Sequence, residues 1–162
     1  MPLSLPDLCD EHGDELSVLH PQFQDFGGRT RFSGEVVTVK CYEDNSVVKQ
    51  TLAETAQGKV LVVDGGGSLN CALLGDMLGA MARDNGWQGI VVYGCVRDVE
   101  ILRTIDIGVR ALHPHPMKSE KRGRGQRDVS VHFANAEIKP GHFLYADENG
   151  IAVADRDLGV DF

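Results

Sequence analysis

Two charged residues, Arg97 and Asp98, stand shortly after an apolar run in the middle of the chain. That run, Gly89 to Tyr93, has the continuous apolar character of a buried strand. Ligands of open α/β sheets bind beyond the carboxyl ends of the strands, so a charged pair at this position suits ligand binding. The alternative is structural: Arg97 and Asp98 form an ion pair between helices, and Asp76 is a surface cap.

A glycine turn, Asp64 to Ser68, is a second candidate site because its backbone amides could bind an anion. A dinucleotide fingerprint fails, since Asn70 stands where the third glycine belongs, and no Gly-Lys-Ser/Thr of a Walker loop follows. Two interpretations of this segment therefore remain: a tight turn between a strand and a helix, and an anion site that does not bind a nucleotide.

Two further groups of side chains have a structural and a functional interpretation. His113 and His115 would share one face of a strand, but flanking prolines and the lack of a third ligand favour a structural pair over a metal site. A basic segment follows, and its default interpretation is a solvated loop, with at most one or two members near the active site. Its members are Lys118, Lys121, Arg122, Arg124 and Arg127.

Composition limits the possible classes of protein. The 162 residues, 42% apolar and 25% charged, predict one globular domain over 1–162. The net charge of -8 argues against direct binding of nucleic acid and leaves a protein partner open. No apolar run approaches the roughly 20 residues of a membrane helix, and no signal peptide is recognisable, so we expect a cytoplasmic protein without membrane association.

The four cysteines form no CxxC pair, which argues against a zinc knuckle or a thioredoxin motif. We expect reduced thiols that behave as small core groups; a reactive Cys95, two residues from Arg97, is the alternative. No serine or cysteine nucleophile can be matched with a base by spacing alone.

Alternating strand and helix patterns predict parallel crossovers in the first two thirds of the chain. Strands are expected over 29–39, 59–63, 89–93 and 109–113, and helices over 6–19, 46–57, 69–85 and 96–107. From Pro114 onward, short apolar runs predict a more antiparallel layer. These runs are 129–133, 137–138, 143–146 and 151–153, with turns at Asn135-Ala136, Pro140-Gly141 and Asn149-Gly150.

A longer pattern connects the charged residues: Gly75-Asp76, twenty intervening residues, then Arg97-Asp98. It is accompanied by FGGRTRFSGEVVTVKCYEDN, VLVVDGGG, NGWQGIVVYGCVRD and HFLYADENGIAVA. Together these resemble the family of the regulator of ribonuclease activity A, the RraA-like family, over nearly the whole chain. The spacing resembles the subset related to class II 4-hydroxy-4-methyl-2-oxoglutarate aldolases.

The resemblance implies an α/β fold of layered α/β/β/α (swivelling β/β/α) type and a homotrimer with sites between subunits. It implies a lyase that uses Mg²⁺ or Mn²⁺ to cleave 4-hydroxy-4-methyl-2-oxoglutarate into two pyruvates, with oxaloacetate decarboxylation as a secondary activity. Such an enzyme stabilises an enolate with a divalent cation bound by oxygen ligands. The other activity in the family is non-enzymatic inhibition of a ribonuclease E-type endonuclease, which an acidic surface would suit.

The resemblance also implies roles for individual residues. Asp98 would be the metal ligand, and Arg97 would donate hydrogen bonds to the 2-oxo oxygen as it becomes an enolate. The segment Gly75, Asp76, Met77 and Leu78 would bind the substrate carboxylate through its amides, and Asp76 would orient a water or relay a proton.

The implied amide site conflicts with the helix predicted over 69–85, whose interior amides are already bonded. We therefore expect the helix to begin nearer Gly75, with Ser68 to Leu74 irregular or in a separate turn. Longer aldolases of this kind carry a carboxyl-terminal region that gives an acidic group to a neighbouring subunit, so with the chain ending at Phe162 we expect reduced turnover.

Overall fold

Four parallel strands form the centre of the molecule, and the computed structural model describes all 162 residues. In sheet order they are β3 (Phe32–Lys40), β4 (Val60–Asp64), β6 (Gly89–Val96) and β7 (Gly108–Pro114). Each contains at least four consecutive buried residues, most of them apolar, as the core of a parallel sheet requires. The prediction of parallel strands in this part of the chain is confirmed.

Antiparallel strands extend this sheet, mostly from the carboxyl-terminal part of the chain, as predicted. From β3 outward, the strand order is β11 (Phe143–Asp147), β12 (Gly150–Ala154) and β1 (Leu16–Val18), of which β11 pairs with β3. The short strands β2 (Gln24–Asp25) and β8 (Gln126–Arg127) pair with β7 and β3, and β9 (Val131–Phe133) and β10 (Ala136–Ile138) form a separate hairpin. The two hairpin turns fall one residue earlier than predicted, at 134–135 and 148–149, because Phe133 pairs with Ala136 and Asp147 with Gly150.

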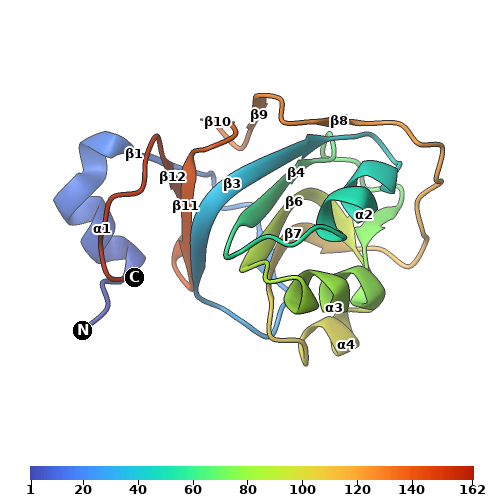
Figure 1. Cartoon of the computed structure of the whole chain (residues 1–162), viewed down its shortest axis with the longest axis horizontal. Helices are drawn as coiled ribbons and strands as arrows, with labels where there is room; N and C mark the ends of the chain where they lie inside the picture. Colours follow the sequence, from blue (N-terminus) through green and yellow to red (C-terminus); the bar gives the residue numbers. More distant parts are fainter.

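Three apolar cores separate four layers, which confirms the α/β/β/α arrangement (Figure 1). In β4, Leu61 and Val63 pack toward the helices, which are α2 (Ser46–Leu52), α3 (Asp76–Asp84) and α4 (Val99–Leu102). Val60 and Val62 pack toward the antiparallel strands. The outer face of β11 and β12 is covered by α1 (Leu5–His12). This alternation follows from the two-residue period of a strand.

The helices are shorter than the sequence pattern predicts. The predicted 6–19 helix ends at His12, where a 3-10 turn, η1 (Gly13–Glu15), leads into β1. Likewise α2 (Ser46–Leu52) stops five residues before the predicted end at Gln57. The prediction over 96–107 was wrong for most of its length, because Val96 completes β6 and only α4 (Val99–Leu102) is helical.

The region 69–85 contains a strand and a helix. Ala72 to Leu74 form β5 (Ala72–Leu74), and α3 (Asp76–Asp84) begins directly after Gly75. The apolar residues that fit a helical period in 72–74 are buried beside β6 instead. The helix predicted over 69–85 was therefore wrong in its first half, and the expected start near Gly75 is confirmed.

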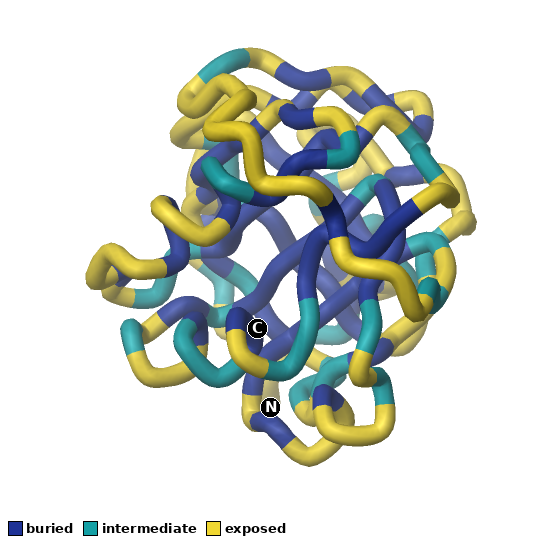
Figure 2. Tube along the Cα trace, turned by 90° about the vertical axis from the view of Figure 1, so that its right-hand side faces the viewer, coloured by how far each residue is buried: buried dark blue, intermediate teal, exposed yellow.

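The two chain ends lie near each other, and the Leu3 amide donates to the Asp161 carbonyl at 2.8 Å (Figure 2). The buried residues in the same view run through the middle of the molecule, with exposed segments around them. None of the helices has the length and apolar character to cross a membrane.

Candidate active site

Two neighbouring parallel strands bring the predicted site residues together. β4 pairs with β6 from Gly89 to Tyr93, and β5 then takes its place beside Cys95 and Val96. The strands β5 and β6 therefore end side by side, and the Arg97 amide donates to the Leu74 carbonyl at 2.9 Å. The next residue of each strand, Gly75 and Arg97, stands at the edge where α/β sheets bind ligands.

Asp98 has a left-handed backbone conformation, with φ of 56° and ψ of 39°. Aspartate is one of the few residues other than glycine that adopts this conformation, and such residues concentrate at functional sites. Its Oδ2 accepts a long hydrogen bond from the Asp76 amide at 3.4 Å and lies 3.9 Å from the Arg97 Nε. A Cβ added at Gly75 would lie only 2.7 Å from this oxygen, so only glycine lets the carboxylate approach this closely.

The amino-terminal end of α3 presents free backbone donors to the same place. The first helical amide bond runs from Gly79 to the Gly75 carbonyl, and no side chain caps the helix. The Met77 and Leu78 amides have no acceptor, and that of Asp76 has only its long bond to Asp98. Free amides and the helix dipole both favour a bound anion.

A cavity of about 230 Å³ surrounds these groups and contains every residue that the sequence predicted for the site. Besides Gly75, Asp76, Met77, Leu78, Arg97 and Asp98, its lining includes Asn45, Lys49, Lys118, Ser119 and Lys121. Two members of the basic segment, Lys118 and Lys121, thus line the cavity, which is the upper limit expected from the sequence. The sequence analysis missed Asn45, Lys49 and Ser119, because these residues come from elements remote along the chain.

Arg97 is only loosely held. Its side chain is 40% exposed, and its Nη1 donates to the Pro116 carbonyl at 3.5 Å, the long limit of a hydrogen bond. The contact with Asp98 at 3.9 Å is also long. Most of its five N–H donors therefore remain available to a ligand.

The segment between β7 and β8, residues 115–125, forms one wall of the site and is attached at several points. The Ala72 amide donates to the Met117 carbonyl at 2.7 Å, and the Asn45 amide donates to the Ser119 hydroxyl at 3.2 Å. Farther along, the buried Asp44 carboxylate accepts hydrogen bonds from the amides of Arg122 and Arg124. The lysines between these points are carried by a fixed backbone.

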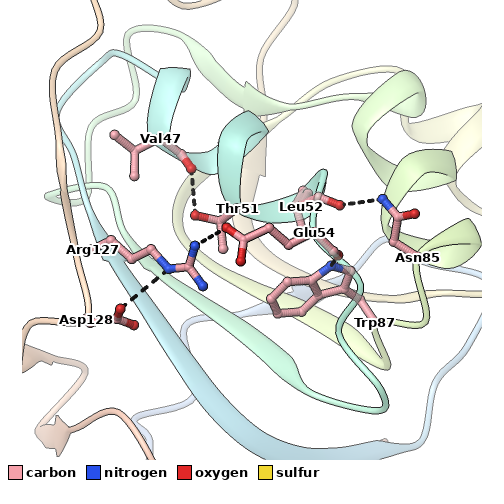
Figure 3. A network of polar contacts seen from close by, with 8 residues as sticks. All are labelled: Val47, Thr51, Leu52, Glu54, Asn85, Trp87, Arg127 and Asp128. Atoms are coloured by element: carbon pink, nitrogen blue, oxygen red, sulfur yellow. Dashed lines mark hydrogen bonds and ion pairs between the residues drawn. The ribbon is translucent and has the colours of Figure 1, made fainter.

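A polar network fixes the far end of this segment to the end of α2 (Figure 3). Arg127 forms an ion pair with Glu54 and lies 3.6 Å from Asp128, between Nε and Oδ2. The Glu54 carbonyl accepts from the Trp87 Nε1 at 3.2 Å, and the Leu52 carbonyl accepts from Asn85 at 2.8 Å. This arrangement ties α2 to the loop after α3 and to β8, so it stabilises two walls of the site.

The oxygen donors of the cavity suit a hard divalent cation. Asp76 and Asp98 are the carboxylates of its lining, and the structure contains no group of three or more His, Cys, Asp or Glu side chains arranged for a metal. Mg²⁺ and Mn²⁺ accept one or two carboxylates and complete their coordination with water and substrate oxygens. An all-protein zinc site needs more ligands than this chain provides here.

The other candidate sites have structural roles. In the glycine turn, the Gly65 and Gly67 amides donate to the Tyr93 carbonyl and the Gly66 amide donates to Asp64, so a tight turn fits and anion binding does not. His115 Nδ1 accepts from the Met117 amide at 3.1 Å, consistent with the structural interpretation of the histidine pair. Cys95 is a buried free thiol, and burial raises its pKa, which argues against the reactive alternative.

Comparison with known proteins defines the class to which this fold and site correspond. The family profile described as RraA-like, Aldolase/RraA, matches residues 5–153. The chain belongs to the RraA-like family.

Relatives within the family carry aldolase names. A protein of Alkalilimnicola ehrlichii is 60% identical over 158 residues, 96% of this chain and 98% of the relative, and is provisionally named a 4-hydroxy-4-methyl-2-oxoglutarate aldolase. Proteins of Hahella chejuensis and Pseudomonas putida with the same provisional name are 54% and 56% identical, each covering at least 94% of both chains.

Two solved structures superpose on nearly the whole chain with a TM-score of 0.94 each. One is described as the RNA-processing inhibitor RraA of Thermus thermophilus, with 45% identity over 99% of this chain and 98% of that one. The other, from Geobacillus kaustophilus, is described as an S-adenosylmethionine:2-dimethylmenaquinone methyltransferase, with 44% identity over 96% and 97%. One backbone thus carries names from three functional classes, so the function must be argued from the site.

Proposed function

We propose that the protein is a divalent-metal-dependent lyase that cleaves 4-hydroxy-4-methyl-2-oxoglutarate into two pyruvates and decarboxylates oxaloacetate as a secondary activity. The observation that carries this proposal is the convergence of a carboxylate, a loosely held arginine and free helix amides in one cavity. A 2-oxo acid has a carboxylate and a carbonyl on adjacent carbons, and these groups match the amides and the arginine. The provisional names of the relatives support the same reaction.

Binding and charge stabilisation fall to different groups of this site. The amides of Asp76, Met77 and Leu78 would hold the C1 carboxylate at the positive end of the α3 dipole. Arg97 would donate to the C2 oxygen, whose negative charge grows toward the transition state, so the interaction lowers the barrier more than it strengthens ground-state binding.

In the proposed reaction the 4-hydroxyl loses its proton and the C3–C4 bond breaks. C4 becomes the carbonyl carbon of one pyruvate, and the bonding electrons pass through C3 to the C2 oxygen. Protonation at C3 then gives the second pyruvate. Asp76 would accept the hydroxyl proton through a water that it orients. Asp98 would hold Mg²⁺ or Mn²⁺, which supplies positive charge next to the substrate oxygens.

The test measures pyruvate release from 4-hydroxy-4-methyl-2-oxoglutarate and from oxaloacetate, with Mg²⁺ or Mn²⁺ and then with chelator. We expect turnover that requires metal and falls at least 1000-fold in Asp98→Ala, because the protein ligand is lost. Asp84→Ala is the matched control, since this exposed carboxylate at the other end of α3 pairs only with its neighbour Arg83. Background rates for both substrates with folded, metal-supplied protein would contradict the proposal.

Inhibition of an RNA-degrading endonuclease is the second candidate function. It is favoured by the 45% identical Thermus thermophilus structure, described as an RNA-processing inhibitor, and by the net charge of -8, which suits a partner rich in arginine. A pull-down with a ribonuclease E-type endonuclease, using wild type and Asp98→Ala, separates the two functions. Equal capture by both proteins supports regulation independent of catalysis, and no capture by either contradicts it.

A further inference from the structure

A second cavity, larger than the one at Asp98, lies away from the candidate active site. Its volume is about 580 Å³, and its lining comes from residues 18–25, from Thr30, from the β11–β12 turn and from β7. It shares no lining residue with the cavity at Asp98. A cavity of this size is large enough for a small organic ligand. The lyase chemistry proposed above does not involve it.

Arg110 lines this second cavity and has an unused hydrogen-bond donor. Its Nη2 donates to the Thr30 and Asp147 carbonyls at 2.6 and 2.9 Å, but its Nη1 has no hydrogen-bond partner. The residue is only 4% exposed, so bulk water does not solvate this nitrogen freely. An unpaired buried donor costs free energy, and a ligand oxygen that accepts from it would remove that cost.

Asp25 places an acceptor beside this donor. Its Oδ1 lies 3.9 Å from Arg110 Nη1, which is too long for a hydrogen bond between the two side chains. Oδ1 accepts only from the Gly27 amide, at 3.2 Å, and Oδ2 accepts from no group of the chain. The Asp25 side chain is 32% exposed and therefore accessible to a ligand. A neighbouring donor and acceptor suit a planar group that carries a carbonyl oxygen and an N–H on one edge.

The charges of the lining argue against an ionic ligand. The carboxylates of Asp25, Asp147 and Glu148 accompany the single guanidinium, so the lining is negative overall and disfavours an anion. The buried positive charge of Arg110 disfavours a metal ion, and no group of three or more His, Cys, Asp or Glu side chains is arranged to bind one. A neutral ligand fits this balance better than either ion.

Apolar side chains supply a surface for a ring. Leu19 and Ile151 belong to the core between the two layers of strands, and Phe23 packs against that core. The Phe23 ring is held by Tyr93 and Phe133, with ring centres 6.4 and 6.0 Å away. A fixed aromatic side chain of this kind favours contact with a flat apolar ring.

We propose that this second cavity binds a neutral planar ring compound whose edge carries a carbonyl oxygen next to an N–H group. This is the chemistry of a pyrimidine base such as uracil and of an aromatic carboxamide such as nicotinamide. The carbonyl oxygen accepts from Arg110 Nη1, the N–H donates to Asp25, and the ring packs against Phe23. The inference goes beyond the proposed function, because no residue of the cavity at Asp98 takes part.

The test titrates the protein with uracil and with nicotinamide and follows its two-dimensional amide NMR spectrum. Each ligand is paired with a methylated analogue that keeps the ring and has no N–H, namely 1,3-dimethyluracil and N,N-dimethylnicotinamide. In the variant Asp25→Asn the side-chain carbonyl can keep its bond from the Gly27 amide, while an NH₂ group replaces the second acceptor. Asp157→Asn is the matched control, because Asp157 Oδ1 accepts from the Gly159 amide at 2.8 Å in the same kind of turn outside the cavity.

We expect at least one of the two ligands to shift the amide signals of Thr30, Gly150 and Ile151 with a Kd of about 1 mM, as suits a ligand of this size. The methyl groups and Asp25→Asn should each weaken binding by about tenfold or more, because a hydrogen bond is lost. Asp157→Asn should leave the Kd unchanged.

Three results would overturn the inference. The first is the absence of shifts at Thr30, Gly150 and Ile151 with either ligand at about 10 mM, which would mean that water or Asp25 itself satisfies the arginine. The second is equal binding of the methylated analogues or an unchanged Kd in Asp25→Asn. The third is a set of shifts confined to Met77 and Leu78, which line the other cavity. Each of these results would leave the proposed lyase function standing.

Discussion

Arg97 follows the end of β6 and Arg110 lies within the neighbouring strand β7, and the two arginines differ in how many of their hydrogen-bond donors are used within the chain. Arg110 lies in β7, is 4% exposed, and its Nη2 donates to the Thr30 and Asp147 carbonyls at 2.6 and 2.9 Å. Its guanidinium also lies 5.3 Å from the centre of the Phe32 ring. Burial lowers the pKa of Arg110, but arginine remains charged at any physiological pH.

Arg97, in contrast, is 40% exposed along its side chain and makes only contacts of 3.5 Å or longer. The cavity beside Arg110 is also the larger, about 580 Å³ against 230 Å³. The comparison teaches that cavity size is a poor guide to catalytic function here. Arg110 holds together three segments of backbone, whereas most donors of Arg97 have no close partner within the chain and are available to a ligand.

The largest expected effects separate these two arginines. Arg97→Ala should lower kcat/KM at least 100-fold, since a donor to developing charge is lost, and change the thermal midpoint by less than 2 °C. Arg110→Met should cost about 3 kcal/mol of unfolding free energy, or roughly 6–12 °C in midpoint, because buried carbonyls lose their donor. Steady-state kinetics and thermal unfolding of both variants measure this, and the opposite pattern would refute the comparison.

A smaller effect is expected from Gly75→Ala, which tests how closely Asp98 must approach α3. The new Cβ would lie 2.7 Å from Asp98 Oδ2, so the carboxylate must move. The φ of Gly75, -136°, is allowed for alanine, so folding should be little affected. We expect a loss of about tenfold in kcat/KM and weaker Mg²⁺ binding, because small displacements of reacting groups are costly.

The control for this change is Gly13→Ala. No atom lies within 4 Å of the added Cβ, and its φ of -53° suits alanine. Activity and Mg²⁺ affinity should stay at wild-type values. If both glycine variants lose activity equally, the close approach of Gly75 and Asp98 has no special importance.

The smallest effect concerns Asp44, a buried carboxylate beside the site whose two oxygens both accept hydrogen bonds. Burial raises its pKa, but hydrogen bonds from Ser46 and from the amides of Arg122 and Arg124 outweigh burial and lower the pKa to about 2. A lowered pKa in the folded state stabilises the protein above the unfolded pKa near 4, and this contribution is lost as the pH falls toward 2.

Asp44→Asn should therefore cost about 1–2 kcal/mol at pH 7 and flatten the pH dependence of stability between pH 4 and pH 2. Chemical denaturation across that pH range measures both quantities. We expect KM to rise by twofold or less, since the lysine segment would loosen. An unchanged pH profile would show that Asp44 is not the group that titrates there.

Local pattern determined the strands of the core. The apolar runs that became β4, β6 and β7 were recognisable because a strand buried on both faces needs continuous apolar residues. The start of α3 at Asp76 was predicted from the resemblance and not from periodicity. Periodicity failed here because Leu73 and Leu74 fit a helical period although they belong to a strand, β5. Short apolar segments are ambiguous because pairing with β6, and not their own propensity, decides their structure.

The sequence by itself, through the linear pattern that resembles the RraA-like family, predicted that Gly75, Asp76, Arg97 and Asp98 lie together, and they line one cavity. Only the tertiary structure decided that Asn45, Lys49, Lys118 and Lys121 join them in one cavity. Those residues come from α2 and from the segment between β7 and β8, and their approach depends on hydrogen bonds over long separations, such as that from the Asn45 amide to Ser119. Contacts of this kind leave no periodic signal, because the free energy that forms them comes from packing the whole sheet.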